Sequence, residues 1–255
     1  MGKRIGIVGY GRLGSYLFDK INGEDNLEVE FVFDLDRKKV TGLDDSMVLD
    51  AMEEARLRHP DLIVEVAHAE WVRGFAPLVL EFSDLLIFSV TAFAKKGLKE
   101  RLDEIAKVNR TRYYISHGAI IGLDGVRDGR ELIEVARITT IRPQAGYGLK
   151  ERVLERTVLY EGPTRKACEL FPQNVNIHAS LALHGIGFER THSTVIADPE
   201  ARVMRHILEV EGRGFAWKVE VEGKPLGERT AAHVPESVFQ TVKRICTEDY
   251  GMILI

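Results

Sequence analysis

The sequence predicts an α/β protein: a Rossmann dinucleotide-binding domain, followed by an α+β domain with an open mixed, mostly antiparallel sheet. Three observations support this prediction. A glycine-rich turn between a strand and a helix opens the chain, apolar β-rich runs alternate with helical stretches up to about residue 116, and alternating apolar and polar residues dominate beyond it. We expect a discontinuous Rossmann domain over residues 1–120 and 231–255, with the second domain at 121–230.

The strongest motif lies near the start of the chain. Gly9, Gly11 and Gly14 form the spacing G-x-G-x-x-G between an apolar strand and an amphipathic helix. The first glycine allows a tight turn, the second lets a pyrophosphate approach the backbone, and the third lets the helix pack on the strand. Arg12 and Leu13 begin the helix, whose free N–H groups and dipole favour phosphates. The turn therefore predicts a dinucleotide site.

An acidic residue after the second strand indicates which cofactor binds. Asp34 stands twenty residues after Gly14, a position from which a carboxylate accepts hydrogen bonds from the adenosine ribose hydroxyls. A carboxylate repels a 2′-phosphate, so NAD is the first choice. Arg37 or Lys38, which follow at once, could bind that phosphate, so NADP is a second possibility. The alternative interpretation of this basic run is a solvated loop.

The first half continues as alternating strands and helices. Apolar runs at 62–67, 85–90 and 112–116 are typical of buried parallel strands, and 96–107 has the periodicity of a helix. Ligands of open α/β sheets bind beyond the carboxyl ends of the strands, which are followed here by 67–68, 91–94 and 117–122. We place Ala67 and His68 in the cofactor site, although His68 fits a loop histidine equally well.

The second half has the pattern of a wetter sheet. Strands are expected at 137–143, 157–162 and 193–198, a helix at 174–184, and a hairpin from 205–211 and 215–222 with one face exposed. A final helix at 231–247 is expected to pack back on the Rossmann domain, which makes that domain discontinuous. Exposed sheet edges tend to be covered, so we expect a homodimer.

Composition excludes several classes of protein. The chain has 35 basic and 39 acidic residues, a net charge of −4, with no basic patch for nucleic acid and no apolar run long enough for a membrane span. Its start leads directly into a strand, so no signal peptide is expected. Cys168 and Cys246 are far apart, which predicts reduced thiols in a cytoplasmic protein. We interpret His178, His184 and His192 as incidental and predict no catalytic metal.

Three segments resemble the L-aspartate dehydrogenase family. Residues 117–124 read H-G-A-I-I-G-L-D, similar to the family's S-G-A-I-G-G-L-D. The second segment has E-G at 161–162 and F-P-Q-N-V-N-I at 171–177, which is similar to the family's E-G…F-P-x-N-x-N-V. The third has G-I-G-F at 185–188 and A-D-P at 197–199, and both motifs precede His206 at the family's spacing. The resemblance covers nearly the whole chain. It implies oxidation of L-aspartate by NAD or NADP to iminosuccinate, which feeds quinolinate and NAD synthesis or hydrolyses to oxaloacetate and ammonia. It also implies a homodimer.

The resemblance assigns roles to individual positions. It implies that His206 is catalytic, that the backbone of Ala119 contacts the cofactor, and that Asn176 lies near the nicotinamide amide. On the substrate side it points to these residues: His117, Asn174, Arg229 and Thr230. The chain departs from the family pattern at His117, which replaces serine, at Ile121, which replaces glycine, and at 227–231, where G-E-R-T-A replaces N-P-K-T-S.

The residue types suit this chemistry, with alternatives. The amine of an amino acid must lose a proton before hydride leaves Cα, and a histidine has the pKa range for that step. His206 would otherwise be a packed residue on the strand face of Leu208 and Val210. Arginines bind carboxylates in pairs of hydrogen bonds, and the candidates are Arg142, Arg205 and Arg229. Asn174 and Asn176 would otherwise cap a helix.

Two other functions fit the same sequence. One is a dehydrogenase of another small amino or hydroxy acid, with a pocket altered at His117, Ile121 and Arg229. The other is a non-catalytic dinucleotide-binding sensor. The presence of both His206 and Asn176 argues against the sensor.

Overall fold

The computed structural model describes residues 2–149, 153–226 and 230–247. The chain forms two compact units. The first comprises Met1–Ser89, Gly97–Ser116 and Pro235–Ile255, and the second comprises Val90–Lys96 and His117–Val234. The first unit contains a parallel sheet with helices and the second a mixed sheet, so the predicted fold class is confirmed.

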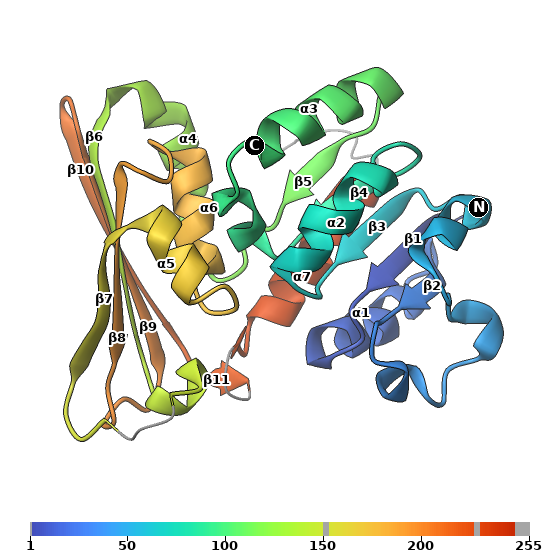
Figure 1. Ribbon diagram of the computed structural model, residues 1–255, viewed down its shortest axis with the longest axis horizontal. Helices are drawn as coiled ribbons and strands as arrows, with labels where there is room; N and C mark the ends of the chain where they lie inside the picture. The colour runs from blue at the N-terminus through green and yellow to red at the C-terminus, as the bar shows by residue number, and fades with distance from the viewer. Residues whose placement is uncertain (1, 150–152, 227–229, 248–255) are drawn as a thin grey trace. The chain divides into compact units, whose positions relative to one another are not determined.

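A five-stranded parallel sheet forms the centre of the first unit (Figure 1). Its order is β2-β1-β3-β4-β5, with the strands β1 (Lys3–Val8), β2 (Leu27–Phe33), β3 (Leu62–Glu65), β4 (Asp84–Ile87) and β5 (Tyr113–Ile115). The helices are α1 (Arg12–Asn22), α2 (Ala69–Val79) and α3 (Leu98–Asn109). The strand order reverses between β1 and β3, and ligands of such sheets bind beyond the strand ends at that point.

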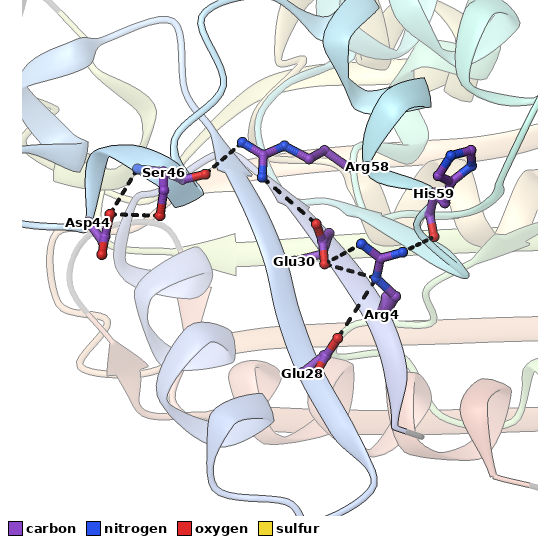
Figure 2. Close-up of polar contacts among 7 residues, drawn as sticks. All are labelled: Arg4, Glu28, Glu30, Asp44, Ser46, Arg58 and His59. Carbon is purple, nitrogen blue, oxygen red and sulfur yellow. Dashed lines mark hydrogen bonds and ion pairs between the residues drawn. The ribbon is translucent and has the colours of Figure 1, made fainter.

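The chain between β2 and β3 makes a long excursion through three 3₁₀ turns, at Arg37–Val40, Asp45–Met47 and Met52–Arg58. Figure 2 shows how ion pairs hold the end of this excursion to the sheet. Glu30 on β2 pairs with Arg4 on β1 at 2.8 Å and with Arg58 at 3.9 Å, and Arg58 also donates to the backbone oxygen of Ser46. Side chains on β1 and β2 therefore fix the end of the excursion.

The last described helix, α7 (Val234–Cys246), lies almost wholly within the first unit. Glu236 accepts a hydrogen bond from the hydroxyl of Tyr16 on α1, and the ammonium of Lys243 pairs with Glu24 at 2.9 Å. The apolar side of the helix, which includes Val238 and Val242, is buried. From Pro235 onward this helix belongs to the first unit, where the sequence analysis placed it.

The second unit is built on a five-stranded sheet of order β10-β9-β6-β8-β7. Its strands are β6 (Ile133–Arg142), β7 (Thr157–Pro163), β8 (Thr191–Ala197), β9 (Met204–Gly212) and β10 (Phe215–Gly223). Only β6 and β8 run parallel, and the other neighbouring pairs are antiparallel. Two short strands, β11 (Pro225–Leu226) and β12 (Thr230–Ala231), form a separate ribbon.

Helices cover one face of the second sheet and leave the opposite face of this unit open (Figure 1). These helices are α4 (Leu123–Gly129), α5 (Thr164–Leu170) and α6 (Asn176–His184), and short 3₁₀ turns lie at Val90–Ala94, Arg130–Leu132 and Gln144–Tyr147. Along β9 and β10 buried residues alternate with more exposed ones, which confirms the expected hairpin with one wet face. Six of the nine residues of α6 are buried, and none is exposed.

The unit boundaries differ from those predicted at two places. Val90–Lys96 and 117–120, assigned by sequence to the first domain, belong to the second unit. The physical reason for the first difference is a pair of hydrogen bonds from Thr91: its N–H donates to Asn176 Oδ1 at 3.1 Å and its hydroxyl donates to the backbone oxygen of Pro172 at 2.7 Å. Among the described residues, no helix combines the length and apolar composition needed to cross a membrane.

Candidate functional site

The glycine turn of the first unit has the geometry of a phosphate cradle. Gly9 has φ +95°, and a Cβ there would lie 2.8 Å from the backbone of Ala67. A Cβ on Gly14 would lie 1.9 Å from the backbone oxygen of Gly9, so only glycine lets α1 approach β1 this closely. Beside Gly11, apart from its chain neighbours, no atom of the described residues lies within 4 Å of the Cβ position, which leaves the backbone open to a ligand. The turn therefore fits a dinucleotide pyrophosphate.

Asp34 lies at the end of β2 and is 8% exposed. Its Oδ2 accepts a hydrogen bond from the backbone N–H of Tyr10 at 2.7 Å, and its Oδ1 accepts one from Asp36 at 2.8 Å. The carboxylate thus joins the glycine turn to the loop after β2. Two carboxylate oxygens have further acceptor capacity for ribose hydroxyls.

A pocket of about 180 Å³ lies between these elements. Five of the predicted cofactor residues line it: Gly9, Gly11, Asp34, Ala67 and His68. His68 also begins α2, where its Nδ1 accepts a hydrogen bond from the N–H of Trp71 at 3.2 Å, so both interpretations of this histidine describe part of its role. Arg12 and Leu13 form the first turn of α1, and neither lines the pocket.

The cation beside Asp34 is not one that the sequence analysis selected. Lys39 lines the pocket, and its ammonium lies 3.3 Å from Asp34 Oδ2. Arg37, which with Lys38 was a candidate for binding a 2′-phosphate, instead pairs with Asp50 and donates to the backbone oxygen of Leu49. The 3₁₀ turn at Arg37–Val40 directs only one of three consecutive cations toward the pocket.

Glu65 is a further residue of this edge that sequence reasoning missed. It ends β3, is fully buried, and accepts hydrogen bonds from the backbone N–H groups of Ala67, Phe88 and Ser89 and from the Ser89 hydroxyl. Burial raises its pKa to about 7, and the four donated hydrogen bonds oppose that rise. Glu65 ties the loops after β3 and β4 together. The available signal was an acidic residue inside an apolar strand sequence.

In the second unit, His206 lies on the helix-covered face of β9 and is 8% exposed. Its Nδ1 lies 2.9 Å from the hydroxyl of Thr140, directly opposite on β6. Burial lowers the pKa of His206 to about 4, and the nearby charges of Arg142 and His233 lower it further in the same direction. The imidazole is therefore neutral at physiological pH, which a proton acceptor requires.

The hydroxyl of Thr140 also contacts a second histidine. Nε2 of His178 lies 2.6 Å from Thr140 Oγ1, and its Nδ1 lies 2.9 Å from the hydroxyl of Ser193. His178 is fully buried, and burial lowers its pKa to about 3. The sequence analysis gave His178 no role, whereas α6 and β8 bring it into the hydrogen-bond chain that ends at His206.

Arg142 is the arginine that the fold brings near His206. It lies two residues after Thr140 on the same face of β6, and its side chain is buried. Its Nη1 donates to Asn174 Oδ1 at 3.1 Å, and its guanidinium lies 5.3 Å from the ring centre of Tyr147. Arg205 lies on the opposite face, where it pairs with Glu220 and Glu222. The strand alternation of β9 therefore excludes Arg205 as a partner of His206.

The remaining predicted residues fall in several places. Asn176 accepts from Thr91 through Oδ1, and neither it nor Asn174 caps α6, whose preceding residue is Val175. Ala119 is buried in the turn before α4, and His117 is half-buried. Ile121, 62% exposed, lines a separate apolar pocket of about 200 Å³ with Trp217. Arg229 lies outside the described residues, and of Thr230 the structure describes only its position in β12.

The first unit has a parallel sheet with a glycine cradle and a buried carboxylate at the end of β2. The second unit holds a buried neutral histidine beside an arginine. Together with the match to an NAD-binding domain, these features define a nicotinamide-dependent oxidoreductase. Comparisons with known proteins identify the family. The family model described as homoserine dehydrogenase, NAD binding domain, matches residues 9–116, and the model described as aspartate dehydrogenase, C-terminal, matches residues 126–245.

Similar proteins extend over nearly the whole chain. An L-aspartate dehydrogenase of Methanosarcina mazei is 34% identical over 95% of this chain and 96% of its own length. An aspartate dehydrogenase domain-containing protein of Xenopus tropicalis is 32% identical over 91% of this chain and 86% of its own. The chain belongs to the L-aspartate dehydrogenase family. The crystal structure of aspartate dehydrogenase from Thermotoga maritima has the same fold, with a TM-score of 0.75, 24% identity, and coverage of 99% of this chain and 100% of that one.

Proposed function

We propose that this protein oxidises L-aspartate to iminosuccinate with NAD or NADP. The observation that carries the proposal is the buried, neutral His206 beside Arg142 in a chain that also holds a complete dinucleotide cradle. The family assignment supplies the substrate, since its curated relatives are named for aspartate. Oxidation of an amino dicarboxylate needs a base for the ammonium proton and a cation that binds a carboxylate.

The first unit supplies cofactor binding in this proposal. The turn at Gly9, Gly11 and Gly14, with the first N–H groups of α1 at Arg12 and Leu13, would hold the pyrophosphate, and Asp34 would hold the ribose. When bound, the nicotinamide ring supplies the acceptor for the hydride that leaves Cα.

Proton transfer and substrate orientation fall to the second unit. His206 accepts the proton of the substrate ammonium, so that the amine lone pair can form the C=N bond. The guanidinium of Arg142 binds a substrate carboxylate, and its hydrogen bond to Asn174 fixes its orientation. Asn176 contributes its side-chain NH₂, which makes no hydrogen bond within the described part of the chain, to the carboxamide of the cofactor. The backbone of Ala119 would contact the cofactor, and His117 would contact the substrate.

A direct assay tests the activity. The purified protein is mixed with NAD or NADP and with L-aspartate, L-glutamate or L-malate, and reduced nicotinamide is followed by absorbance. We expect turnover with aspartate alone. His206→Ala should greatly lower kcat and leave the affinity for NAD nearly unchanged. Turnover with a different acid would move the protein to another substrate, and NAD binding without any turnover would favour a sensor.

The position of Lys39 favours use of both cofactors. Its ammonium lies beside Asp34 at the pocket wall, where it would offset the repulsion between that carboxylate and a 2′-phosphate. Lys39→Ala should therefore raise KM for NADP about tenfold and change KM for NAD less than about twofold. Arg37→Ala serves as the matched control, because the Arg37 side chain pairs with Asp50. An equal change for the two cofactors in Lys39→Ala would contradict this role.

The wider setting follows from the same proposal. The product iminosuccinate would feed quinolinate and NAD synthesis, or hydrolyse to oxaloacetate and ammonia. The edge strands of the second sheet, β10 and β7, support a homodimer, because exposed sheet edges tend to be covered. A monomer-sized particle in light scattering at micromolar concentration would exclude it. Two buried, unbridged cysteines support a cytoplasmic location.

A further inference from the structure

A continuous chain of side-chain hydrogen bonds runs through the second unit from a backbone carbonyl to His206. The Thr164 hydroxyl lies 2.9 Å from the backbone oxygen of Thr191 and 2.7 Å from the Ser193 hydroxyl. From Ser193 the chain continues through both ring nitrogens of His178 to Thr140, and from Thr140 to Nδ1 of His206. All five side chains are buried.

Such a chain of hydroxyls and imidazoles has two self-consistent directions, and the carbonyl at its end selects one. A carbonyl oxygen only accepts, so the single hydroxyl hydrogen of Thr164 points to Thr191. Thr164 must then accept from Ser193, and Ser193 must accept from Nδ1–H of His178. The reverse direction would leave two oxygens 2.9 Å apart with no hydrogen between them.

The direction continues beyond His178 because this imidazole is neutral. Full burial holds its pKa at about 3, so a ring with its hydrogen on Nδ1 presents a lone pair at Nε2. Nε2 accepts the hydrogen of the Thr140 hydroxyl, whose oxygen then accepts from Nδ1–H of His206. The one remaining ring nitrogen, Nε2 of His206, makes no hydrogen bond within the described residues.

We propose that this chain, anchored on the Thr191 carbonyl, holds His206 in the tautomer with hydrogen on Nδ1 and a free lone pair on Nε2. His178 and Ser193 are positioning residues, because they act on the substrate only through Thr140 and His206. The role of Nε2 as the proton acceptor rests on the proposed function, whereas the tautomer does not.

Nuclear magnetic resonance of the full-length protein labelled with ¹⁵N-histidine tests the tautomer without substrate. Two-bond correlations between ring protons and ring nitrogens at pH 7.5 show which nitrogen carries hydrogen. The His206 and His178 signals are assigned by their loss in His206→Gln and His178→Gln. We expect hydrogen on Nδ1 of both rings. Hydrogen on Nε2 of His206 in the unmodified protein would overturn the proposal.

A matched pair of serine variants tests the coupling. Ser193→Ala removes the acceptor of His178 Nδ1–H, so both tautomers of His206 become populated, and kcat should fall about five- to tenfold with KM for NAD unchanged. Ser180→Ala, a buried serine of α6 outside the chain, should change neither signal nor rate. Ser193→Thr retains a hydroxyl and should keep hydrogen on Nδ1.

The outcomes separate the two proposals. An unchanged His206 signal and an unchanged kcat in Ser193→Ala would overturn the control of the tautomer by the chain. If Ser193→Ala does not fold, the tautomer of the unmodified protein still decides the question. If the protein shows hydrogen on Nδ1 of His206 but does not oxidise aspartate, the proposed function is excluded. The control of the tautomer by the hydrogen-bond chain is then still supported.

Discussion

The burial of His178 makes a quantitative prediction about stability and pH. Its folded pKa, about 3, lies below the unfolded value of about 6.5, because burial disfavours the charged ring. The unfolded chain therefore binds a proton first as the pH falls, so the stabilisation is complete above pH 6.5 and is lost below it. Between pH 7.5 and 5.5 the unfolded histidine becomes mostly protonated, which lowers the free energy of unfolding by about 1.4 kcal/mol.

The same argument applies to His206, whose pKa of about 4 gives a nearly equal loss of free energy of unfolding between pH 7.5 and 5.5. The two histidines together lower the free energy of unfolding by about 2.7 kcal/mol. Other groups titrate in the same range. Glu65, with a pKa raised to about 7, acts in the opposite direction, because the native state then binds the proton more readily than the unfolded chain. A comparison between variants removes these shared contributions.

The assay is urea unfolding followed by circular dichroism at pH 7.5 and 5.5, for the unmodified protein and for His178→Gln. Glutamine can donate to Ser193 and accept from Thr140, but it does not titrate. The variant should lose about 1.4 kcal/mol less than the unmodified protein between the two pH values. Ser180→Ala, a non-titrating change on the same helix, should show the full loss. An equal loss in the unmodified protein and His178→Gln would refute the reasoning.

Further predictions concern the cradle and the substrate cation. Gly14→Ala should destabilise the first unit by about 1–3 kcal/mol in urea unfolding, because its Cβ would meet the backbone oxygen of Gly9 at 1.9 Å. Gly11→Ala should leave that stability unchanged, since the Cβ position is open, and should weaken NAD binding by about tenfold or more in calorimetry. Unchanged NAD affinity in Gly11→Ala would contradict the proposed pyrophosphate position. Arg142→Lys should raise KM for aspartate by about ten- to a hundredfold with KM for NAD unchanged, because lysine cannot form a bidentate pair. An unaltered KM for aspartate would exclude Arg142 as its binding group.

Local sequence determined the parts of the molecule that were predicted well. The glycine turn, the strand before it and the helix after it lie within twenty-two residues, and each glycine has a local steric reason. The alternation of β9 and β10 likewise follows from a period of two along neighbouring residues. Patterns of this kind need no knowledge of which segments meet.

The hydrogen-bond chain could not be predicted in this way. Thr140, Thr164, His178 and Ser193 meet only because β6 pairs with β8 in parallel and α5 and α6 pack on that sheet. No residue of α6 is exposed, so the helix has no wet face whose contrast would mark His178 as unusual. The choice of Lys39 among three consecutive cations was also hidden, because it depends on the turn of the 3₁₀ segment.

The placement of α7 has a consequence for synthesis of the protein on the ribosome. The helix that binds Tyr16 and Glu24 follows the whole second unit in the chain. The strands of the first unit therefore leave the ribosome long before the helix that completes their packing, and the second unit can close its own sheet in the meantime. The nascent chain would carry an unfinished dinucleotide-binding unit with an apolar surface awaiting Val238 and Val242. During that interval the first unit is the segment most in need of protection by chaperones.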